Sequence, residues 1–384
     1  MKVIFVSNFF NHHQSAISDA LWEKTEGQFA FVETSPMPPE QRQLGYHSLQ
    51  RPYLLDSLLH EEQVARLIRE ADVMIAGAAP ESLVRRRVKT GKLMFRYSER
   101  PLKNGLELWK YLPRLLRWHW RNPGGKPIYL LCASAYAAGD YAKFGLFRGR
   151  SYQWGYFPEA KQYENPGKMI EKKDPRRILW CGRFLPLKHA DDALWAAKRL
   201  KEEGYAFRLD FIGRGEMEEP LKELTREWAL SDCVRFLGSM NPEQVRENME
   251  NAGIYLFTSD RQEGWGAVLN ESMNSGCAVI AGHAIGAVPF LIRDGENGLI
   301  YESENREMLY EKLRFLLDHP EEQARLGANA CDTIVTQWNA DTAAQRLIAL
   351  SERILAGESG SELYKNGPCS PAKEMQDDWN QMPV

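Results

Sequence analysis

The chain alternates short, mostly apolar runs with longer stretches in which apolar residues recur every three or four positions. Short runs rich in β-branched and aromatic residues are typical of buried strands, and the longer pattern predicts amphipathic helices. In the first half the predicted strands are residues 3–7, 29–33, 73–76, 93–97, 128–132 and 151–156. In the second half they are residues 177–181, 208–212, 234–237, 254–258, 278–281 and 298–300. Strands that alternate with helices predict parallel sheets built from βαβ units.

The two series are separated by residues 158–175, which are rich in Pro, Lys, Glu and Gly and indicate a linker. At 384 residues the chain is also longer than one ordinary core requires. We therefore expect two Rossmann-like, doubly wound α/β domains, residues 1–165 and 166–340, facing each other across a cleft. A helix over 341–356 is expected to pack back toward the first domain, and the polar residues 357–384 to form a flexible tail.

Composition narrows the class of protein. A hydrophobic fraction of 43% with a net charge of −3 excludes a disordered chain and argues against nucleic acid binding over the whole surface. No apolar run reaches the length of a membrane span. The six cysteines form no CxxC pair, which favours a reducing, cytoplasmic location. No D-x-D triplet occurs, so neither a metal ion nor another cofactor is expected.

The strongest chemical signal follows the strand at 254–258. Glu263 stands in a loop before Gly264, Trp265, Gly266 and Ala267, and Glu271 lies about one and a half turns into the helix that begins there. Glycines allow backbone N–H groups to approach a ligand closely, and the N–H groups of a helix start favour an anion. The alternative is a pair of ordinary solvated glutamates.

A second signal follows the strand at 177–181. Arg183 offers a planar fork of five donors and Lys188 a point charge from the same loop, so together they could clamp a diphosphate. Gly213 and Gly238 mark glycine-bearing loops after the next two strands. The glycines after the strand at 208–212 are only a fragment of a dinucleotide fingerprint, which weakens the case for an NAD dehydrogenase.

Taken in order, these motifs resemble the nucleotide-sugar-binding half of family-4 retaining glycosyltransferases, the glycosyl transferases group 1, which have the GT-B fold. The resemblance covers residues 176–300. It implies that Arg183 and Lys188 bind the donor diphosphate, that Glu271 holds the ribose and that Glu263 steadies the transition state. It also implies that backbone groups of Gly264, Trp265, Gly266 and Ala267 face the donor and that Gly238 and Met240 lie near the base.

The first half is expected to bind the acceptor, a glycan or a lipid-linked molecule. The loop after the first strand supplies Asn11, His12 and His13, and the loop after residues 93–97 supplies Glu99 and Arg100. These polar groups are candidate acceptor-binding residues, because loops after strands line the sites of parallel sheets. Surface histidines and a surface Arg–Glu pair are the alternatives.

Residues 81–126 carry thirteen Lys or Arg against three Glu, a local charge of +10, and include Trp109, Trp118 and Trp120. Basic residues with interfacial aromatics suit an anionic membrane surface. Basic solvated faces over a tryptophan-rich core are the alternative. A peripheral position on the inner face of a membrane would suit a lipid-linked acceptor.

The function predicted is therefore a metal-independent, retaining transfer of a sugar from a nucleotide diphosphate, UDP rather than GDP, in cell-surface polysaccharide synthesis. The alternative enzyme is a GT-B-fold epimerase or hydrolase of nucleotide sugars. The alternative from another class is a nucleic-acid-binding protein that uses residues 81–126, but paired glutamates and a diphosphate clamp have no role in reading bases.

Overall fold

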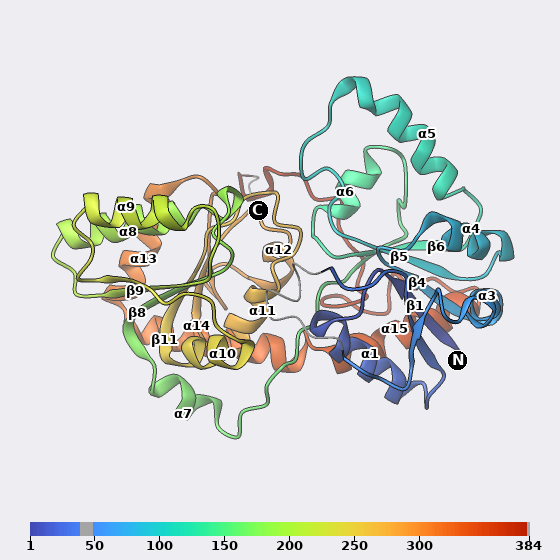
Figure 1. The fold of residues 1–384 in the computed structure, drawn as a ribbon, viewed down its shortest axis with the longest axis horizontal. Coiled ribbons are helices and arrows are strands. Elements are labelled where there is room, and N and C mark those ends of the chain that lie inside the picture. Colours follow the sequence, from blue (N-terminus) through green and yellow to red (C-terminus); the bar gives the residue numbers. More distant parts are fainter. Residues whose placement is uncertain (39–48, 382–384) are drawn as a thin grey trace. The chain divides into compact units, whose positions relative to one another are not determined.

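The computed structural model describes residues 1–38 and 49–381, and the chain forms two compact units (Figure 1). The first unit comprises residues 1–159 and 339–377, and the second comprises residues 160–338 and 378–384. The chain thus first passes from one unit to the other after residue 159, a few residues before the boundary between 165 and 166 expected from the sequence.

The first unit is built on a sheet of seven parallel strands in the order β3-β2-β1-β4-β5-β6-β7. The strands are β1 (Val3–Ser7), β2 (Phe29–Glu33), β3 (Leu54–Asp56), β4 (Val73–Ala76), β5 (Met94–Ser98), β6 (Ile128–Cys132) and β7 (Ser151–Gln153). Only β3 is absent from the sequence prediction, because its three half-buried residues are too few to show a period. The reversal of strand order between β1 and β4 marks this sheet's topological switch point.

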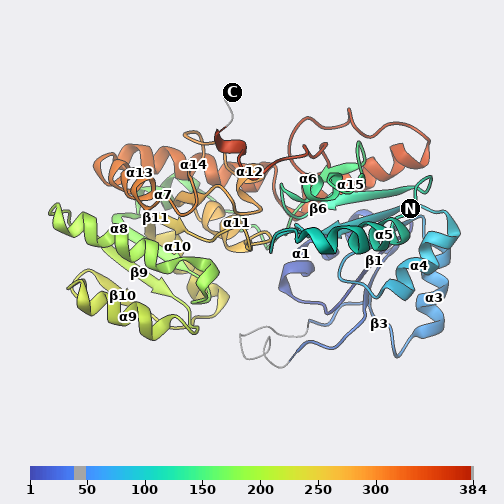
Figure 2. The same cartoon turned by 90° about the horizontal axis from the view of Figure 1, so that it is seen from above.

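Helices cover both faces of this sheet, as the parallel topology requires. They are α1 (His12–Lys24), α3 (Glu61–Glu70), α4 (Glu81–Thr90), α5 (Tyr111–Arg121), α6 (Ala137–Ala142) and α15 (Ala340–Leu355), with a 3-10 turn at η1 (Leu108–Lys110). Helix α15 packs against α1, so the helix expected at 341–356 belongs to the first unit. Helices α3 and α4 lie side by side (Figure 2). Arg87 of α4 is fully buried and donates to the carbonyls of Ile68 and Leu93, which fixes α4 to α3 and β5.

The second unit repeats this design with six parallel strands in the order β10-β9-β8-β11-β12-β13. The strands are β8 (Asp174–Cys181), β9 (Arg208–Ile212), β10 (Val234–Phe236), β11 (Ala252–Phe257), β12 (Ala278–Gly282) and β13 (Leu299–Tyr301). Its helices are α7 (Pro166–Glu171), α8 (Ala190–Glu202), α9 (Glu218–Glu227), α10 (Pro242–Asn251), α11 (Ala267–Asn274), α12 (Val288–Leu291), α13 (Arg306–Asp318) and α14 (Pro320–Thr336), with a 3-10 turn at η2 (Pro186–Lys188). Here the switch point lies between β8 and β11.

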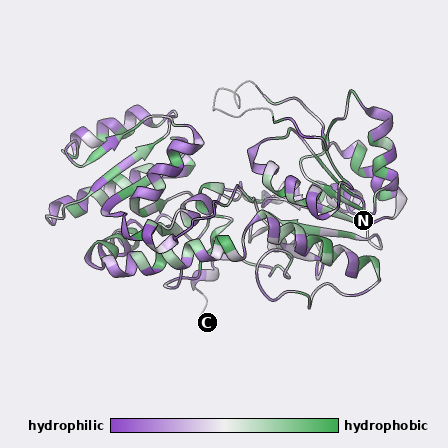
Figure 3. Cartoon of the chain, turned by 90° about the horizontal axis from the view of Figure 1, so that it is seen from below, coloured by the Kyte–Doolittle hydropathy of each residue, from purple (hydrophilic) through white to green (hydrophobic). Residues whose placement is uncertain are grey.

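In the second unit, α8, α9 and α13 cover one face of the sheet, and α10, α11 and α14 lie on the other (Figure 1). The first face holds an apolar core, in which the rings of Trp180 and Phe184 stack with their centroids 5.3 Å apart. The helices carry hydrophilic and hydrophobic residues along their length (Figure 3), as expected when each buries one face. This packing fixes β8 and the loop that follows it.

The C-terminal segment differs from the flexible tail expected over 357–384. Its described part, residues 357–381, includes a stretch that pairs with β7, where Tyr152 and Pro371 form an antiparallel bridge. The Gln153 amide donates to the Ser370 carbonyl at 2.7 Å, and Cys369 is fully buried. Strand β7 is the last strand of its sheet, and an edge strand's unpaired backbone groups favour such a partner. The sequence did not predict this pairing. Backbone groups form it, and the polar side chains of the segment give no signal of it. Residues 382–384 lie outside the described residues.

We predict that Gly139→Ala in α6 weakens the attachment of this segment. A Cβ atom at Gly139 would lie 2.2 Å from the carbonyl oxygen of Met375, so the two backbones must separate. Overpacking of this kind lowers the free energy of unfolding by about 1–3 kcal/mol, and residues beyond 357 should become more sensitive to limited proteolysis. Gly124→Ala is the control, because a Cβ atom there meets nothing within 4 Å. Equal proteolysis of the two variants would contradict the prediction.

Candidate functional site

The candidate donor site lies at the switch point of the second sheet, where the loops after β8 and β11 leave in opposite directions. Lys188 ends the first loop and Glu263 stands in the second, and their side chains form an ion pair. Each side chain is only 15% exposed. The hydroxyl of Ser259 also donates to Glu263 Oε2, at 3.1 Å. The structure therefore brings together the cation and the carboxylate that the sequence singled out.

Backbone and hydroxyl contacts hold the two loops against each other. The Thr258 hydroxyl donates to the carbonyl of Lys188 at 2.6 Å and accepts from the indole N–H of Trp180 at 2.9 Å. The amide of Asp260 donates to the carbonyl of Leu187 at 2.9 Å. Because these contacts fix the main chain on both sides, the ion pair is positioned by the fold as well as by its own attraction.

Glycines bring the loops after β8, β9 and β10 into contact. The Gly182 amide donates to the carbonyl of Ile212 at 3.0 Å, and the Gly213 amide donates to that of Gly238 at 2.9 Å. Gly213 has a φ of +138°, and a Cβ atom there would lie 1.9 Å from the Gly182 carbonyl oxygen. Only glycine can occupy this position, so the row of glycine-bearing loops forms one continuous backbone edge.

The loop from Glu263 ends at the start of α11. Gly266, with a φ of +90°, places its backbone where a Cβ atom would meet the Phe257 ring at 2.3 Å. Trp265 is buried, and its indole N–H donates to Asn270 at 2.9 Å. Its side chain thus belongs to the core, so this residue and Gly264 offer a ligand their backbone, as does Ala267 at the first position of α11.

Glu271 lies inside α11 with its carboxyl group buried. Burial raises the pKa of Glu271, and Arg246 opposes that rise. The Arg246 guanidinium donates to the Glu271 carbonyl at 3.3 Å and to the Asn274 side chain at 2.7 Å. Burial and the charge of Glu271 together raise the pKa of the Cys181 thiol to about 12, which places the carboxylate beside the end of β8. Glu271 therefore belongs to the same edge as Gly182.

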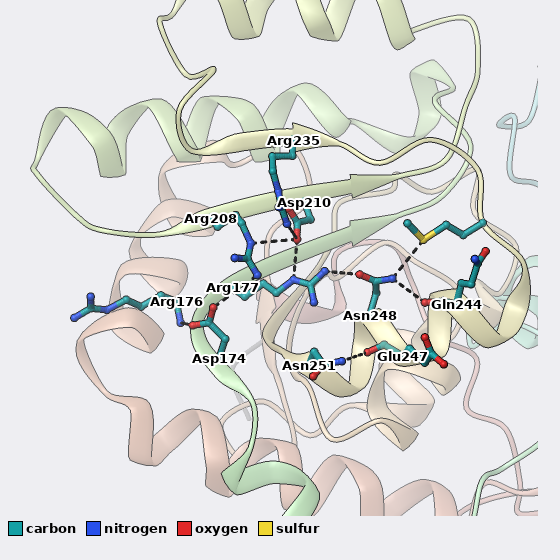
Figure 4. Close-up of polar contacts among 11 residues, drawn as sticks. Asp174, Arg176, Arg177, Arg208, Asp210, Arg235, Gln244, Glu247, Asn248 and Asn251 are labelled. Carbon is teal, nitrogen blue, oxygen red and sulfur yellow. Dashed lines mark hydrogen bonds and ion pairs between the residues drawn. The ribbon is translucent and has the colours of Figure 1, made fainter.

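A buried charged network fixes the loop that carries Met240 (Figure 4). Asp210 is fully buried and accepts from Arg177 at 2.7 Å and from Arg235 at 2.8 Å. Burial alone would raise the pKa of Asp210, but hydrogen bonds from Arg235 and Arg177 hold that pKa below its usual range. Arg177 also donates to Asn248 of α10, whose amide contacts the Met240 sulfur at 3.3 Å. The chain from Asp210 to Met240 was not visible in the sequence, since its members come from three strands and a helix.

Arg183 is less constrained than Lys188. Its side chain is exposed, while the next residue, Phe184, is buried and its amide donates to the Arg214 carbonyl at 2.9 Å. Among the residues that the structure describes, no ion pair joins Arg183 to Glu263. The expected pair of cations is therefore divided into a fixed lysine and an exposed arginine on the same loop.

The first unit has its own pocket, of about 540 Å³, at the switch point between β1 and β4. It is lined by Ser7 and Asn8 after β1, by Gly77 after β4, by Glu99 after β5 and by Ala133 after β6. Parallel sheets place ligands at this position. The pocket is therefore the candidate acceptor site.

His13, Tyr156 and the carboxylate of Glu99 all line this pocket. The Tyr156 hydroxyl donates to Glu99 Oε1 at 2.7 Å, and the rings of Tyr156 and His13 stack with centroids 6.0 Å apart. His12, predicted as an acceptor-binding residue, contacts His13 with ring centroids 4.1 Å apart but is not among the residues that line the pocket. Asn11 also lines the pocket, but its side chain accepts from the His13 amide at 2.8 Å and so caps α1. The sequence missed Tyr156, although its place just after β7 was a usable signal.

Arg100 does not fit the acceptor-binding role expected for it. Its side chain is 1% exposed and forms ion pairs with Asp140 at 3.3 Å and with Asp377 at 2.8 Å. Its guanidinium also lies over the Tyr136 ring, 4.5 Å from the centroid. The arginine is buried because the C-terminal segment supplies a carboxylate from far along the chain, which no local pattern reveals.

We predict that His13 makes folding sensitive to acid. Burial, with a smaller contribution from His12, lowers the pKa of His13 from 6.5 to about 3. The unfolded chain takes up the proton first, so stability is complete above pH 6.5 and falls as the pH drops toward 3. At pH 5 this group lowers the free energy of unfolding by about 2 kcal/mol relative to pH 7. His13→Gln should remove this part of the difference between urea unfolding at pH 7 and pH 5, whereas exposed His60→Gln should not. Identical pH dependence in both variants would refute the assignment.

Comparison with known proteins finds similarities to glycosyltransferases. Residues 162–333 match the family model described as Glycosyl transferases group 1. The amylovoran biosynthesis glycosyltransferase AmsK of Erwinia amylovora is 27% identical over 185 residues, which are 47% of this chain and 45% of that protein. The chain thus matches less than half the length of that relative. The GDP-mannose-dependent alpha-(1-6)-phosphatidylinositol monomannoside mannosyltransferase of Mycobacterium tuberculosis is 23% identical over 379 residues, 90% of this chain and 97% of the relative.

Solved structures resemble both units together. Anabaena Alr3699/HepE, crystallised with UDP, superimposes with a TM-score of 0.67 at 13% identity, covering 93% of this chain and all of that one. A glycosyltransferase from Rickettsia africae gives a TM-score of 0.66 at 14% identity, covering 92% and 98%. The chain therefore has the GT-B fold, and its residues 162–333 are similar to the glycosyl transferases group 1.

Proposed function

We propose that the protein is a retaining glycosyltransferase of family 4, which transfers a sugar from a nucleotide-diphosphate donor to a glycan or a lipid-linked acceptor. The observation that carries this proposal is the contact between Lys188 and Glu263 at the switch point of the second sheet. A cation and a carboxylate that share one partly buried position suit a reaction in which negative charge leaves and positive charge develops close by.

The residues divide the chemistry between them. As the bond from the sugar to the diphosphate breaks, negative charge grows on the leaving oxygen, and Lys188 and Arg183 stabilise it without a metal ion. Lys188 has three N–H donors, so it can keep Glu263 and still donate to a phosphate oxygen. Glu263 faces the positive charge that develops on the sugar, and Glu271 accepts hydrogen bonds from the ribose. No cofactor is needed in this scheme.

The base is assigned to the loop that carries Gly238 and Met240, which the network around Asp210 holds in place. We favour UDP over GDP. The preference follows the Anabaena structure, which was solved with UDP. The name of the mycobacterial relative specifies GDP-mannose instead, so both nucleotides belong in the test.

The first unit's pocket supports a transferase over the alternative nucleotide-sugar epimerase or hydrolase. It is a second built site, lined by His13, Glu99 and Tyr156, and a transferase needs such a site for its acceptor. Hydroxyl, carboxylate and imidazole groups together suit sugar hydroxyls. We further propose that the acceptor is built for a cell-surface polysaccharide and that the enzyme acts on the cytoplasmic face of an anionic membrane through residues 81–126.

We predict that UDP-sugars or GDP-sugars raise the melting temperature of the protein, and that Arg183→Ala abolishes this shift because the diphosphate loses its fork of donors. A panel of nucleotide sugars, NAD and a short RNA, followed by thermal unfolding, measures this. Exposed Arg293→Ala, in the same unit but paired with Glu296, is the control and should keep the shift. If NAD or RNA stabilises the protein and no nucleotide sugar does, the proposal fails.

We predict that substitutions at the two glutamates change different kinetic constants. Glu263→Gln should lower kcat by about 100-fold or more with little change in donor KM, because it removes charge stabilisation of the transition state. Glu271→Gln should raise donor KM by about tenfold and leave kcat nearly unchanged, because it weakens ground-state binding. Steady-state kinetics with the donor found in the panel tests both. Small and equal effects would make both glutamates bystanders.

A further inference from the structure

Helix α5 and the 3-10 turn η1 before it carry a stripe of large apolar side chains, each of which is more than half exposed. Eight large apolar side chains of the described residues are exposed, and four of them lie within this short stretch of chain. The four, called here the α5 stripe, are Trp109 (74% exposed), Leu112 (61%), Leu116 (64%) and Trp120 (57%). Isolated exposed leucines are ordinary, but a contiguous set on one helix marks a contact surface.

The stripe is distinct from the face by which α5 is attached. Leu112, Leu116 and Trp120 are spaced four apart, so they cover an arc of about 80° of the helix. On another side, Trp118 is 8% exposed and packs on the Phe144 ring with centroids 4.6 Å apart. Tyr111 stacks on the same ring at 4.9 Å. Burying the aromatic face is enough to attach the helix, so the stripe is not part of the core (Figure 1 shows α5 in teal).

Positive charge flanks the stripe. Arg114, Arg117 and Arg121 follow one another along α5, and the Arg85 guanidinium of α4 lies 3.6 Å from the centroid of a Trp120 ring. The surrounding residues 81–126 carry a net charge of +10 in a chain of net charge −3. A second copy of this chain is a poor occupant, since a symmetric contact would bring two such fields together. An anionic surface with an apolar interior is complementary to both features.

The length of α5 decides how it could meet such a surface. Its eleven residues span about 16 Å, far short of a bilayer's hydrocarbon core. No helix within the described residues has the length and apolarity to pass through a bilayer. Tryptophans near both ends of the stripe suit the level of the lipid headgroups. A short amphipathic helix with these features lies in the plane of the interface.

We propose that α5 docks this protein on an anionic bilayer, with the α5 stripe below the headgroups and its arginines on the lipid phosphates. The loop that leads to α5 begins at Glu99, which lines the pocket of the same unit. Docking would therefore hold that pocket near the lipid surface. The inference rests on the proposed function only for the nature of the acceptor, a sugar carried on a lipid.

The test is flotation of the full chain with vesicles of phosphatidylglycerol and phosphatidylcholine in equal parts, or of phosphatidylcholine alone. The wild type should float with the anionic vesicles and much less with the neutral ones. Leu112→Ser/Leu116→Ser should lower the partition coefficient by about tenfold, since it removes apolar area without changing charge. Leu58→Ser/Leu59→Ser is the matched control, because these leucines are 77% and 78% exposed in the same unit, and should float like the wild type. Arg114→Gln/Arg117→Gln should reduce flotation with the anionic vesicles and leave flotation with the neutral vesicles unchanged.

Three results would overturn the docking proposal. They are a wild type that does not float, equal flotation of the two leucine variants, and binding of RNA in place of vesicles. A dimer in light scattering that dissociates in Leu112→Ser/Leu116→Ser, without flotation, would assign the stripe to a second copy. The thermal shift with nucleotide sugars, measured on the same variants, separates the two proposals. Flotation without any nucleotide-sugar shift would leave the docking intact and remove the proposed function.

Discussion

The donor edge of the second unit depends on backbones that approach more closely than any side chain allows. Gly213 lies against the carbonyl of Gly182, and its amide donates to the carbonyl of Gly238. Three parallel strands thereby end in one continuous edge of loops, and the edge stands beside the point where the strand order reverses. This arrangement fixes where Lys188 and Glu271 lie. Lys188 stands in the loop after β8, which is part of this edge, and Glu271 lies in α11, which follows the neighbouring strand β11.

The ion pair of Lys188 and Glu263 is better understood as a positioning device than as a source of stability. Pairs that are largely removed from water recover little net free energy, because desolvation offsets their attraction. Here the Thr258 hydroxyl and the Asp260 amide tie the same two loops together through neutral hydrogen bonds. The fold therefore holds the two charges in contact. Asp210 serves a similar purpose further along the edge, because its arginine network reaches the helix behind Met240.

The first unit joins three features that the chain order separates. Its pocket lies at the ends of the central strands, the loop after Glu99 leads from it to α5, and the C-terminal segment returns to bury Arg100. Asp377 thus acts on the loop that follows β5 from the far end of the sequence. A pocket, a basic helix with exposed apolar side chains and a C-terminal segment that buries an arginine are thus parts of one unit.

Periodicity by itself determined most strands and the parallel fold, because buried strands leave local signals in the sequence. The family resemblance came from the order of the glycine-bearing and charged motifs after those strands. Periodicity also placed Lys188 and Glu263 in loops at strand ends, and topology makes such loops meet. The sequence could not reveal that Tyr156 binds Glu99, that Arg100 is buried, or that residues 369–372 pair with β7. These contacts join residues far apart in the chain through single side chains or backbone groups. Only the tertiary structure decides them, since no local pattern records which distant partner a polar group will find.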